Sequence, residues 1–345
     1  MKIFNRNPHR YLIILLLSVV LLLIAVFLSV SIGVSGSSFT IVKDLLTAYD
    51  NASAFHNVIV EVRIPRIIAA ILTGAAFALS GAIMQRITAN PFADTGLLGI
   101  NAGAGFFVAV GLVLFQSISF FAVIVLAFCG AAFGTLLVYS IGFRSKSGIT
   151  PLRLLLAGAA ITALLTSLSQ GIAIYYGLAK DLTYWSVGSL SGISWQQLQI
   201  VAPVLITGFI AALVLAPYLS ALAFGEETAI NLGVHVHLVR TLAILIVLIL
   251  AGTSVSIVGG ISFLGLMIPH IAVFLVGPND KKFLPVTAIL GSTLLVLADI
   301  AGRTINAPYD TPVGALVAVI GVPFFLVMTY YRIGGKLWTR QQKQR

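Results

Sequence analysis

Long apolar runs separated by short polar segments make up most of the chain. The first run, Tyr11 to Ile32, follows three cations at Lys2, Arg6 and Arg10. It is longer than the apolar part of a secretory signal peptide and matches the ~20 residues that a membrane-spanning helix needs. The pattern therefore predicts a retained first span whose N-terminus lies in the cytoplasm.

Nine more apolar runs follow, at about residues 64–85, 97–115, 118–142, 152–176, 198–219, 238–258, 261–276, 283–304 and 312–331. Each is near the length that a bilayer core requires of a helix. The pattern predicts an all-α polytopic membrane protein with ten transmembrane helices over residues 11–333. The flanking segments, 1–10 and 334–345, are then a cytoplasmic N-terminus and a basic cytoplasmic tail.

Composition supports a membrane protein. Apolar residues are 59% of the chain, charged residues are 9%, and the mean hydropathy is +1.08, which together exclude a soluble domain of this length. The formal net charge of +10 could indicate a nucleic-acid partner. The cations lie in short segments between apolar runs, however, so we interpret them as a topology signal and expect no nucleic acid.

The distribution of cations tests the orientation, because cytoplasmic loops of membrane proteins are rich in Lys and Arg. Ten spans return the C-terminus to the cytoplasm. Fifteen cations then lie inside: Lys2, Arg6, Arg10, Arg86, Arg144, Lys146, Arg153, Arg240, Lys281, Lys282, Arg332, Lys336, Arg340, Lys343 and Arg345. Five lie outside: Lys43, Arg63, Arg66, Lys180 and Arg303. The excess inside supports cytoplasmic termini.

A polar, charged segment from Gly225 to Arg240 separates two long apolar runs. The predicted topology places it in the cytoplasm. Gly225 and Gly233 are helix breakers, so we predict a coupling segment over 220–237 with two short helices that contact a soluble partner. The alternative is a solvated loop in which Glu226 and Glu227 only balance nearby lysines.

Polar side chains within the spans are few. Four share one face of the fifth span: Thr162, Thr166, Ser169 and Gln170. They either form hydrogen bonds between helices or line a translocation path. Asp299 and Arg303 are four residues apart, which allows an ion pair in the ninth span. Glycine combined with proline, in 90–99 and 259–269, predicts broken helices beside a cavity.

The chain lacks the motifs of nucleotide use, zinc hydrolysis and serine hydrolysis, namely G-x-x-x-x-G-K-[ST], H-E-x-x-H and G-x-S-x-G. Intramembrane acids are also sparse, which disfavours the alternative of an ion-coupled secondary transporter. His270 beside Pro269 leaves open an intramembrane enzyme, but it has no evident carboxylate partner. Active transport would therefore draw its energy from a partner.

An ordered series of motifs runs through the chain: Val62-Arg63-Ile64-Pro65-Arg66, Gly81-Ala82-Ile83-Met84-Gln85, Asn90-Pro91-Phe92-Ala93, Gly96-Leu97-Leu98-Gly99, Gly188-Ser189-Leu190, the Gly225 to Gly233 segment, Gly265-Leu266-Met267-Ile268-Pro269-His270, Leu297-Ala298-Asp299 with Arg303, and Pro312-Val313-Gly314 through Gly321-Val322-Pro323-Phe324. In this combination the chain resembles the FecCD family. These proteins are permease subunits of bacterial type II ABC importers for ferric siderophores, haem and cobalamin.

The resemblance implies roles for three groups of residues. The coupling helices that dock on the ATPase match Gly225, Glu226, Glu227, Leu232 and Gly233. Docking of the substrate-binding protein maps to Arg63, Arg66 and Arg303, whose alternative roles are snorkelling at the membrane interface or pairing with Glu61 and Asp299. Inner gates map to Asn90, Phe92 and Thr150. Phe92 stands where relatives often have leucine, so a bulkier gate is expected.

The resemblance also implies the partners. We expect a second permease subunit, identical or paralogous, two cytosolic ATPases that use the ATP, and an extracytoplasmic binding protein, all at the bacterial cell membrane. No cofactor is expected on this chain, which would carry out no catalysis itself. Ferric siderophore is the first choice of substrate, and haem or cobalamin is the alternative.

Overall fold

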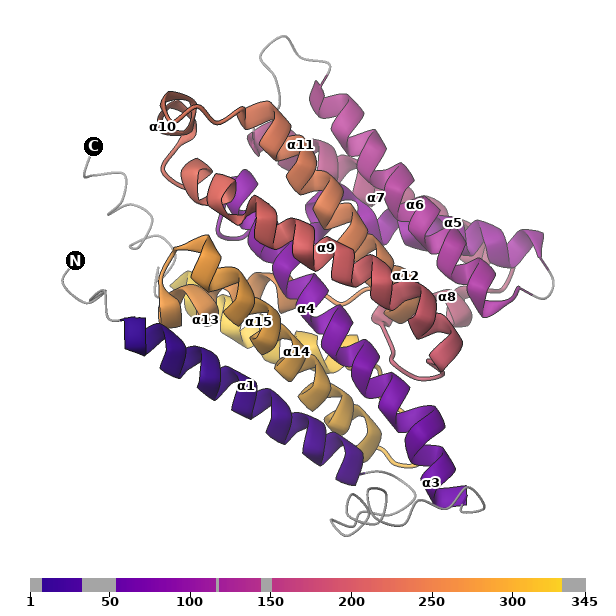
Figure 1. Cartoon of the computed structure of the whole chain (residues 1–345). Coiled ribbons are helices and arrows are strands. Elements are labelled where there is room, and N and C mark those ends of the chain that lie inside the picture. The colour runs from indigo at the N-terminus through magenta and orange to yellow at the C-terminus, as the bar shows by residue number, and fades with distance from the viewer. Residues whose placement is uncertain (1–7, 33–53, 116–117, 144–150, 331–345) are drawn as a thin grey trace.

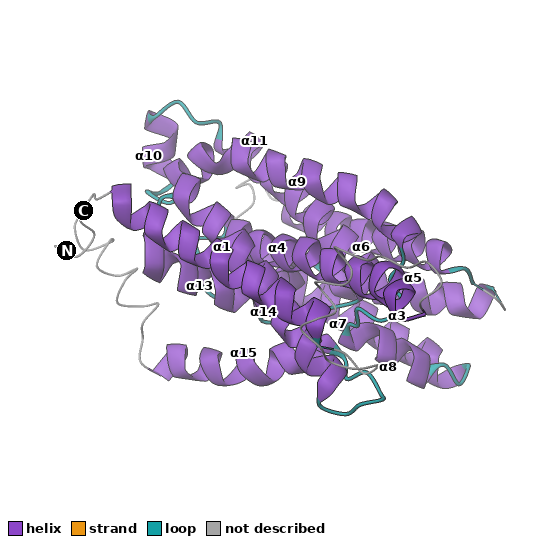
Figure 2. Cartoon of the chain, turned by 60° about the horizontal axis from the view of Figure 1, so that its bottom comes forward, coloured by secondary structure: helices purple, strands orange, loops and turns teal. Residues whose placement is uncertain are grey.

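The computed structural model of the chain describes residues 8–32, 54–115, 118–143 and 151–330. The regular structure of these residues is entirely helical (Figure 2), which confirms the predicted all-α fold. The helices are α1 (Pro8–Ser31), α3 (Ala54–Val58), α4 (Ile64–Ile87), α5 (Ile100–Leu114), α6 (Phe120–Phe143), α7 (Pro151–Tyr175), α8 (Ala179–Val187), α9 (Trp195–Leu222), α10 (Glu226–Asn231), α11 (Val236–Val247), α12 (Thr253–Val258), α13 (Leu264–Val276), α14 (Asp280–Thr304) and α15 (Val313–Tyr330).

Each of the ten predicted apolar runs is helical. Eight helices in the described ranges are long and apolar enough to cross a membrane; one of these, Val236–Val258, joins α11 to α12 through a π-helical turn, Leu248–Gly252. The third and eighth runs are shorter apolar helices, Ile100–Leu114 and Leu264–Val276. The count of ten spans therefore stays a prediction.

The predicted helix breaks occur where glycine and proline cluster. After α4 the chain makes an irregular connection and a 3-10 turn, Thr95–Leu98, before α5 begins. Between α12 and α13 the backbone is again irregular, with Gly259 at φ 75° and Phe263 at φ 66°. This second break is held by a neighbouring connection, because the N–H of Ser189 donates to the carbonyl of Val258 at 2.8 Å.

Helix α4 lies at the centre of the bundle (Figure 1) and is the most buried of the long apolar helices in the described ranges. Glycine lets its neighbours approach closely. A Cβ built on Gly74 would lie 2.6 Å from the carbonyl oxygen of Gly291 in α14, and one on Gly81 would lie 1.9 Å from that of Gly265 in α13. These contacts confirm that small residues set the packing of the bundle core.

The bundle has two polar ends. Helix α10 lies at the same end as the beginning of α1 and the end of α15, whereas α3 and α8 lie at the opposite end (Figures 1 and 2). We call these the α10 end and the α3 end. The predicted topology likewise places the coupling segment on the same side as the two termini.

Candidate functional site

Helix α10 is the short helix predicted in the coupling segment. It begins after Gly225 and is followed by Gly233, whose φ angles of 105° and 78° are in the region that favours glycine. The second short helix that we predicted is not separate, because the chain passes from Gly233 directly into the long helix α11 at Val236. The segment is thus one ordered helix on a glycine-bounded turn rather than an irregular loop.

One residue of α10 anchors it and the others face outward. Ala229 is fully buried, whereas Ile230 and Leu232 are 57% and 65% exposed. Glu226 forms an ion pair of 2.8 Å with Arg240 of α11, and Glu227 is exposed. Helix α10 and the turn after it therefore present exposed apolar and acidic side chains, and the buried Ala229 seats the helix on the bundle.

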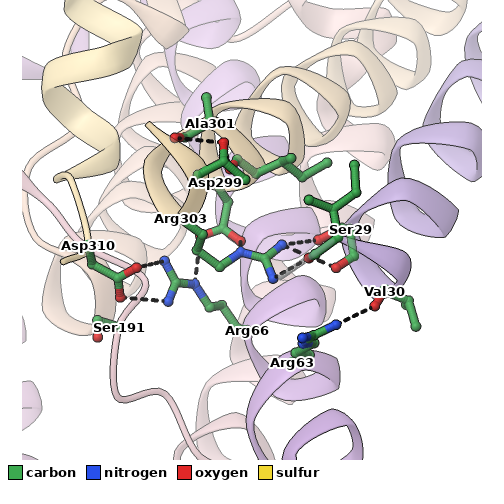
Figure 3. A network of polar contacts seen from close by, with 12 residues as sticks. Ser29, Val30, Arg63, Arg66, Ser191, Asp299, Ala301, Arg303 and Asp310 are labelled. Carbon is green, nitrogen blue, oxygen red and sulfur yellow. Dashed lines mark hydrogen bonds and ion pairs between the residues drawn. The ribbon is translucent and has the colours of Figure 1, made fainter. Parts of the chain in front are cut away.

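The α3 end contains a buried network of arginines and aspartates (Figure 3). Arg66 Nε donates to Asp299 Oδ1, 2.6 Å away, and Nη1 and Nη2 of Arg66 donate to the two carboxylate oxygens of Asp310 at 2.9 and 3.4 Å. Arg303 Nε lies 3.1 Å from Asp299 Oδ2. Asp299 thus lies between two arginines that offset the cost of burying its charge.

The same network holds the end of α1. Arg303 donates to the hydroxyl and carbonyl of Ser29, at 2.7 and 3.2 Å, and to the carbonyl of Ile32 at 3.3 Å. Arg63 donates to the carbonyl of Val30 at 2.8 Å. The last carbonyls of a helix have no partner within the helix and carry partial negative charge, so these cations stabilise the C-terminus of α1.

The three arginines predicted to dock a binding protein are all buried, since Arg63, Arg66 and Arg303 are 4%, 7% and 6% exposed. Arg66 and Arg303 both pair with Asp299, as the alternative interpretation predicted. Snorkelling toward water does not describe these buried side chains, and their docking role stays a prediction. Sequence reasoning missed Asp310, because it lies in the connection between α14 and α15 and far from Arg66 in the chain.

The predicted gate residues lie beside two aromatic groups from other helices. Asn90 Oδ1 accepts the N–H of Phe92 at 2.9 Å, which fixes the turn after α4. The Phe92 ring stacks on the ring of His270 in α13, with the ring centres 6.4 Å apart. It also meets the ring of Phe325 in α15 edge to face, with the centres 5.6 Å apart. Phe325 was not predicted, and the third predicted gate residue, Thr150, lies outside the described residues.

His270 itself has little chemical support for a catalytic role. Its Nδ1 lies 2.7 Å from the carbonyl of Leu266 in the same helix. Among the described residues, no three His, Cys, Asp or Glu side chains gather as metal ligands would. In the structure the His270 ring thus serves as a stacking partner for the Phe92 ring.

The polar face of α7 divides into two pairs. Thr162 donates to the carbonyl of Gly96 at 3.3 Å, and the buried Ser169 donates to Leu165 in its own helix at 2.6 Å. Thr166 and Gln170 are exposed on the surface of the chain. Thr162 thus bonds to the connection before α5 and Ser169 bonds within α7, whereas Thr166 and Gln170 face the surface of the chain; a role in the path stays a prediction for all four.

Comparison with known proteins shows the family. A model of the FecCD transport family matches residues 21–331. The chain belongs to this family. Among FecCD relatives, the iron(3+)-hydroxamate import system permease protein FhuB of Bacillus subtilis (strain 168) is 39% identical over 94% of this chain and 85% of its own length. The Fe(3+)-citrate import system permease protein YfmD of the same organism is 38% identical over 94% of this chain and 96% of its own length.

A solved structure agrees with the FecCD assignment. It shows a metal-chelate type ABC transporter in an inward-facing conformation, 28% identical, with a TM-score of 0.81 over 92% of this chain and 99% of that one. The resemblance drawn from the motifs is thereby confirmed over residues 21–331. The comparisons do not address single residues, so the coupling, docking and gate roles stay predictions.

Proposed function

We propose that this FecCD chain is the permease subunit of an ATP-driven importer of ferric siderophores and that α10 couples it to a cytosolic ATPase. The observation that carries the proposal is the form of α10. A helix seated by the buried Ala229 and exposing Glu227, Ile230 and Leu232 fits a complementary cleft on a soluble partner. The chain itself has no catalytic step in this proposal, because the partner hydrolyses ATP.

The substrate class rests on the relatives. A hydroxamate-system permease and a citrate-system permease are almost equally similar to this chain, at 39% and 38% identity. Ferric chelates as a class are therefore better supported than either one, and they rank above haem and cobalamin. Selectivity then resides mainly in an extracytoplasmic binding protein that delivers the chelate.

A second permease subunit is part of the proposal. Helices α7 and α15 are buried over only 28% of their apolar windows. Thr166 and Gln170 are exposed on α7. An amide that faces lipid is costly, so we place Gln170 toward a water-filled path shared with a second permease. Alternating access between the two ends of that path would then be driven by two ATPases.

The test is a Glu226→Ala/Glu227→Ala double variant in a strain that lacks the wild-type gene. We expect membrane levels to be unchanged, ATPase co-purification to be lost and uptake of one radiolabelled ferric siderophore to fall to the level of the deletion strain. Asp181→Ala, which removes an exposed acid from α8 at the opposite end, is the control for ATPase co-purification. Normal uptake by the double variant would contradict coupling through α10.

Haem and cobalamin belong on the same uptake panel. Loss of haem or cobalamin uptake, with iron chelate uptake intact, would replace the proposed substrate and leave the coupling proposal standing.

A further inference from the structure

A second buried ion pair joins α4 to α14, at the α10 end. Arg86 Nε donates to Asp280 Oδ1 at 2.8 Å, and the Asp280 side chain is fully buried. Arg86 also donates to the carbonyl of Pro278 at 2.8 Å, and its guanidinium lies 5.2 Å from the centre of the Phe283 ring. The arginine at the last turn of α4 is thus fixed on the first turn of α14.

Ser220 of α9 completes this contact. Its hydroxyl donates to Asp280 Oδ2 at 2.8 Å, and its oxygen lies 3.2 Å from the backbone N–H of Asp280, which donates to it. The two carboxylate oxygens of Asp280 are therefore divided between Arg86 on α4 and Ser220 on α9. Three helices meet at one buried carboxylate.

The segment between Ser220 and α10 is short, and backbone hydrogen bonds hold it to the end of α9. Successive N–H groups of Ala223, Phe224 and Gly225 donate to carbonyls of the final turns of α9, at Leu219, Ala221 and Leu222, over 3.0 to 3.1 Å. Gly225 is the residue on which α10 begins. A displacement of α10 therefore acts on Ser220 through a short, hydrogen-bonded segment.

On the other side of the carboxylate, Arg86 leads directly into the connection that carries Phe92. The N–H of Ala89 donates to the carbonyl of Arg86 at 3.3 Å, and Ala89 has a φ of 47°, in the region that side chains rarely adopt. Asn90 then fixes the N–H of Phe92. The arginine that binds Asp280 thus also holds the start of the predicted gate.

We propose that Ser220, Asp280 and Arg86 form a link that transmits movement of α10 to α4 and to the connection holding Phe92. They are positioning residues, since none of them touches substrate. The inference rests on the proposed function, in which the ATPase moves α10. A purely structural pair would need only Arg86 and Asp280; the hydroxyl of Ser220 adds the helix that leads to α10.

The test is Ser220→Ala in the permease reconstituted with its ATPases in proteoliposomes. The change removes the hydroxyl and leaves the Arg86 and Asp280 pair in place. We expect normal assembly with the ATPase. We also expect the ratio of iron transported to ATP hydrolysed to fall about fivefold or more, which is the lower end of the range typical of coupling between two sites. Ser220→Thr restores a hydroxyl and is expected to restore the ratio.

Thr207→Ala is the matched control, because Thr207 is an exposed hydroxyl on the same helix that donates only to the carbonyl of Val204 in the structure. A ratio in Ser220→Ala equal to that of Thr207→Ala and wild type would overturn the link while leaving the proposed function intact. Loss of ATPase binding in Ser220→Ala would also overturn it, since Ser220 would then shape the docking surface. Failure of the wild type to bind any ATPase would overturn both proposals.

Discussion

The two arginine–aspartate pairs between α4 and α14 have the same chemistry and different surroundings. Arg66 binds Asp299 at the α3 end, and Arg86 binds Asp280 at the α10 end. At 1.5 Å per residue, the arginines are about 30 Å apart along α4, which is the thickness of a bilayer core. One antiparallel helix pair is therefore held by an ion pair at each face of the membrane.

The difference lies in what else each carboxylate contacts. Asp299 is paired with a second arginine, Arg303, and Arg66 also binds Asp310. Asp280 has one arginine and the hydroxyl of Ser220. The α3 end thus has a network with several charges that support one another, which favours a fixed arrangement. The α10 end has a simpler contact that connects α4 and α14 to the segment proposed to move.

The largest expected effect is at the α3 end. Asp299→Ala would leave Arg66 and Arg303 buried without their shared carboxylate, and breaking a buried pair costs about 3–5 kcal/mol. We expect a strong drop in the thermal melting temperature of the purified protein in detergent. Asp181→Ala, an exposed change, should melt like wild type; an unchanged melting temperature for Asp299→Ala would show that the network does not hold this end.

The next largest effect is expected where α4 and α14 pack closely between the two ion pairs. A Cβ on Gly74, between the two pairs, would lie 2.6 Å from the carbonyl oxygen of Gly291, so Gly74→Ala must push α4 away from α14. Overpacking of this kind costs about 1–3 kcal/mol. Gly171→Ala in α7, where a Cβ would meet nothing within 4 Å, is the control. Equal melting temperatures for the two variants would contradict tight packing at Gly74.

Asp280→Ala is expected to destabilise less than Asp299→Ala. It leaves one arginine, Arg86, without its carboxylate, whereas Asp299→Ala takes a carboxylate from both Arg66 and Arg303. The expected cost is about 1–3 kcal/mol. Melting of the two alanine variants side by side measures the difference between the ends directly, and a larger loss for Asp280→Ala would reverse the comparison.

The smallest effect on stability is expected for Glu226→Gln. Its partner contact with Arg240 involves a carboxylate that is 48% exposed, and such pairs contribute about 0–1 kcal/mol. The melting temperature should stay within a few degrees of wild type. A loss as large as that of Asp280→Ala would show that α10 is part of the structural core rather than a surface segment.

Much of the fold could be predicted from sequence because the signals are local. The length of each apolar run fixes a helix, and Gly225 and Gly233 mark the ends of the coupling segment through backbone conformations that glycine tolerates. The pairing of Asp299 with Arg303 also follows from their spacing on one helix. The exposed face of α10 could be anticipated since it is charged within an otherwise apolar chain.

The remaining features depend on which helices become neighbours. Arg66 contacts Asp310 only once α4 packs beside the connection that follows α14, and Asp280 contacts Ser220 only once α14 packs against α9. Three arginines predicted to face outward are buried for the same reason, because the end of α1 and two aspartates lie around them. No local pattern encodes such partners.

The sequence by itself therefore determined that this protein is a bundle of apolar helices of membrane-spanning length, interrupted by a polar segment bounded by glycines. The length of an apolar run and the backbone conformation of a glycine are local properties, so they can be predicted without knowing which segments become neighbours. Only the tertiary structure decided which charge meets which. A buried charge is stable only beside an opposite charge or a hydrogen-bonding group, and packing brings that partner from a distant part of the chain.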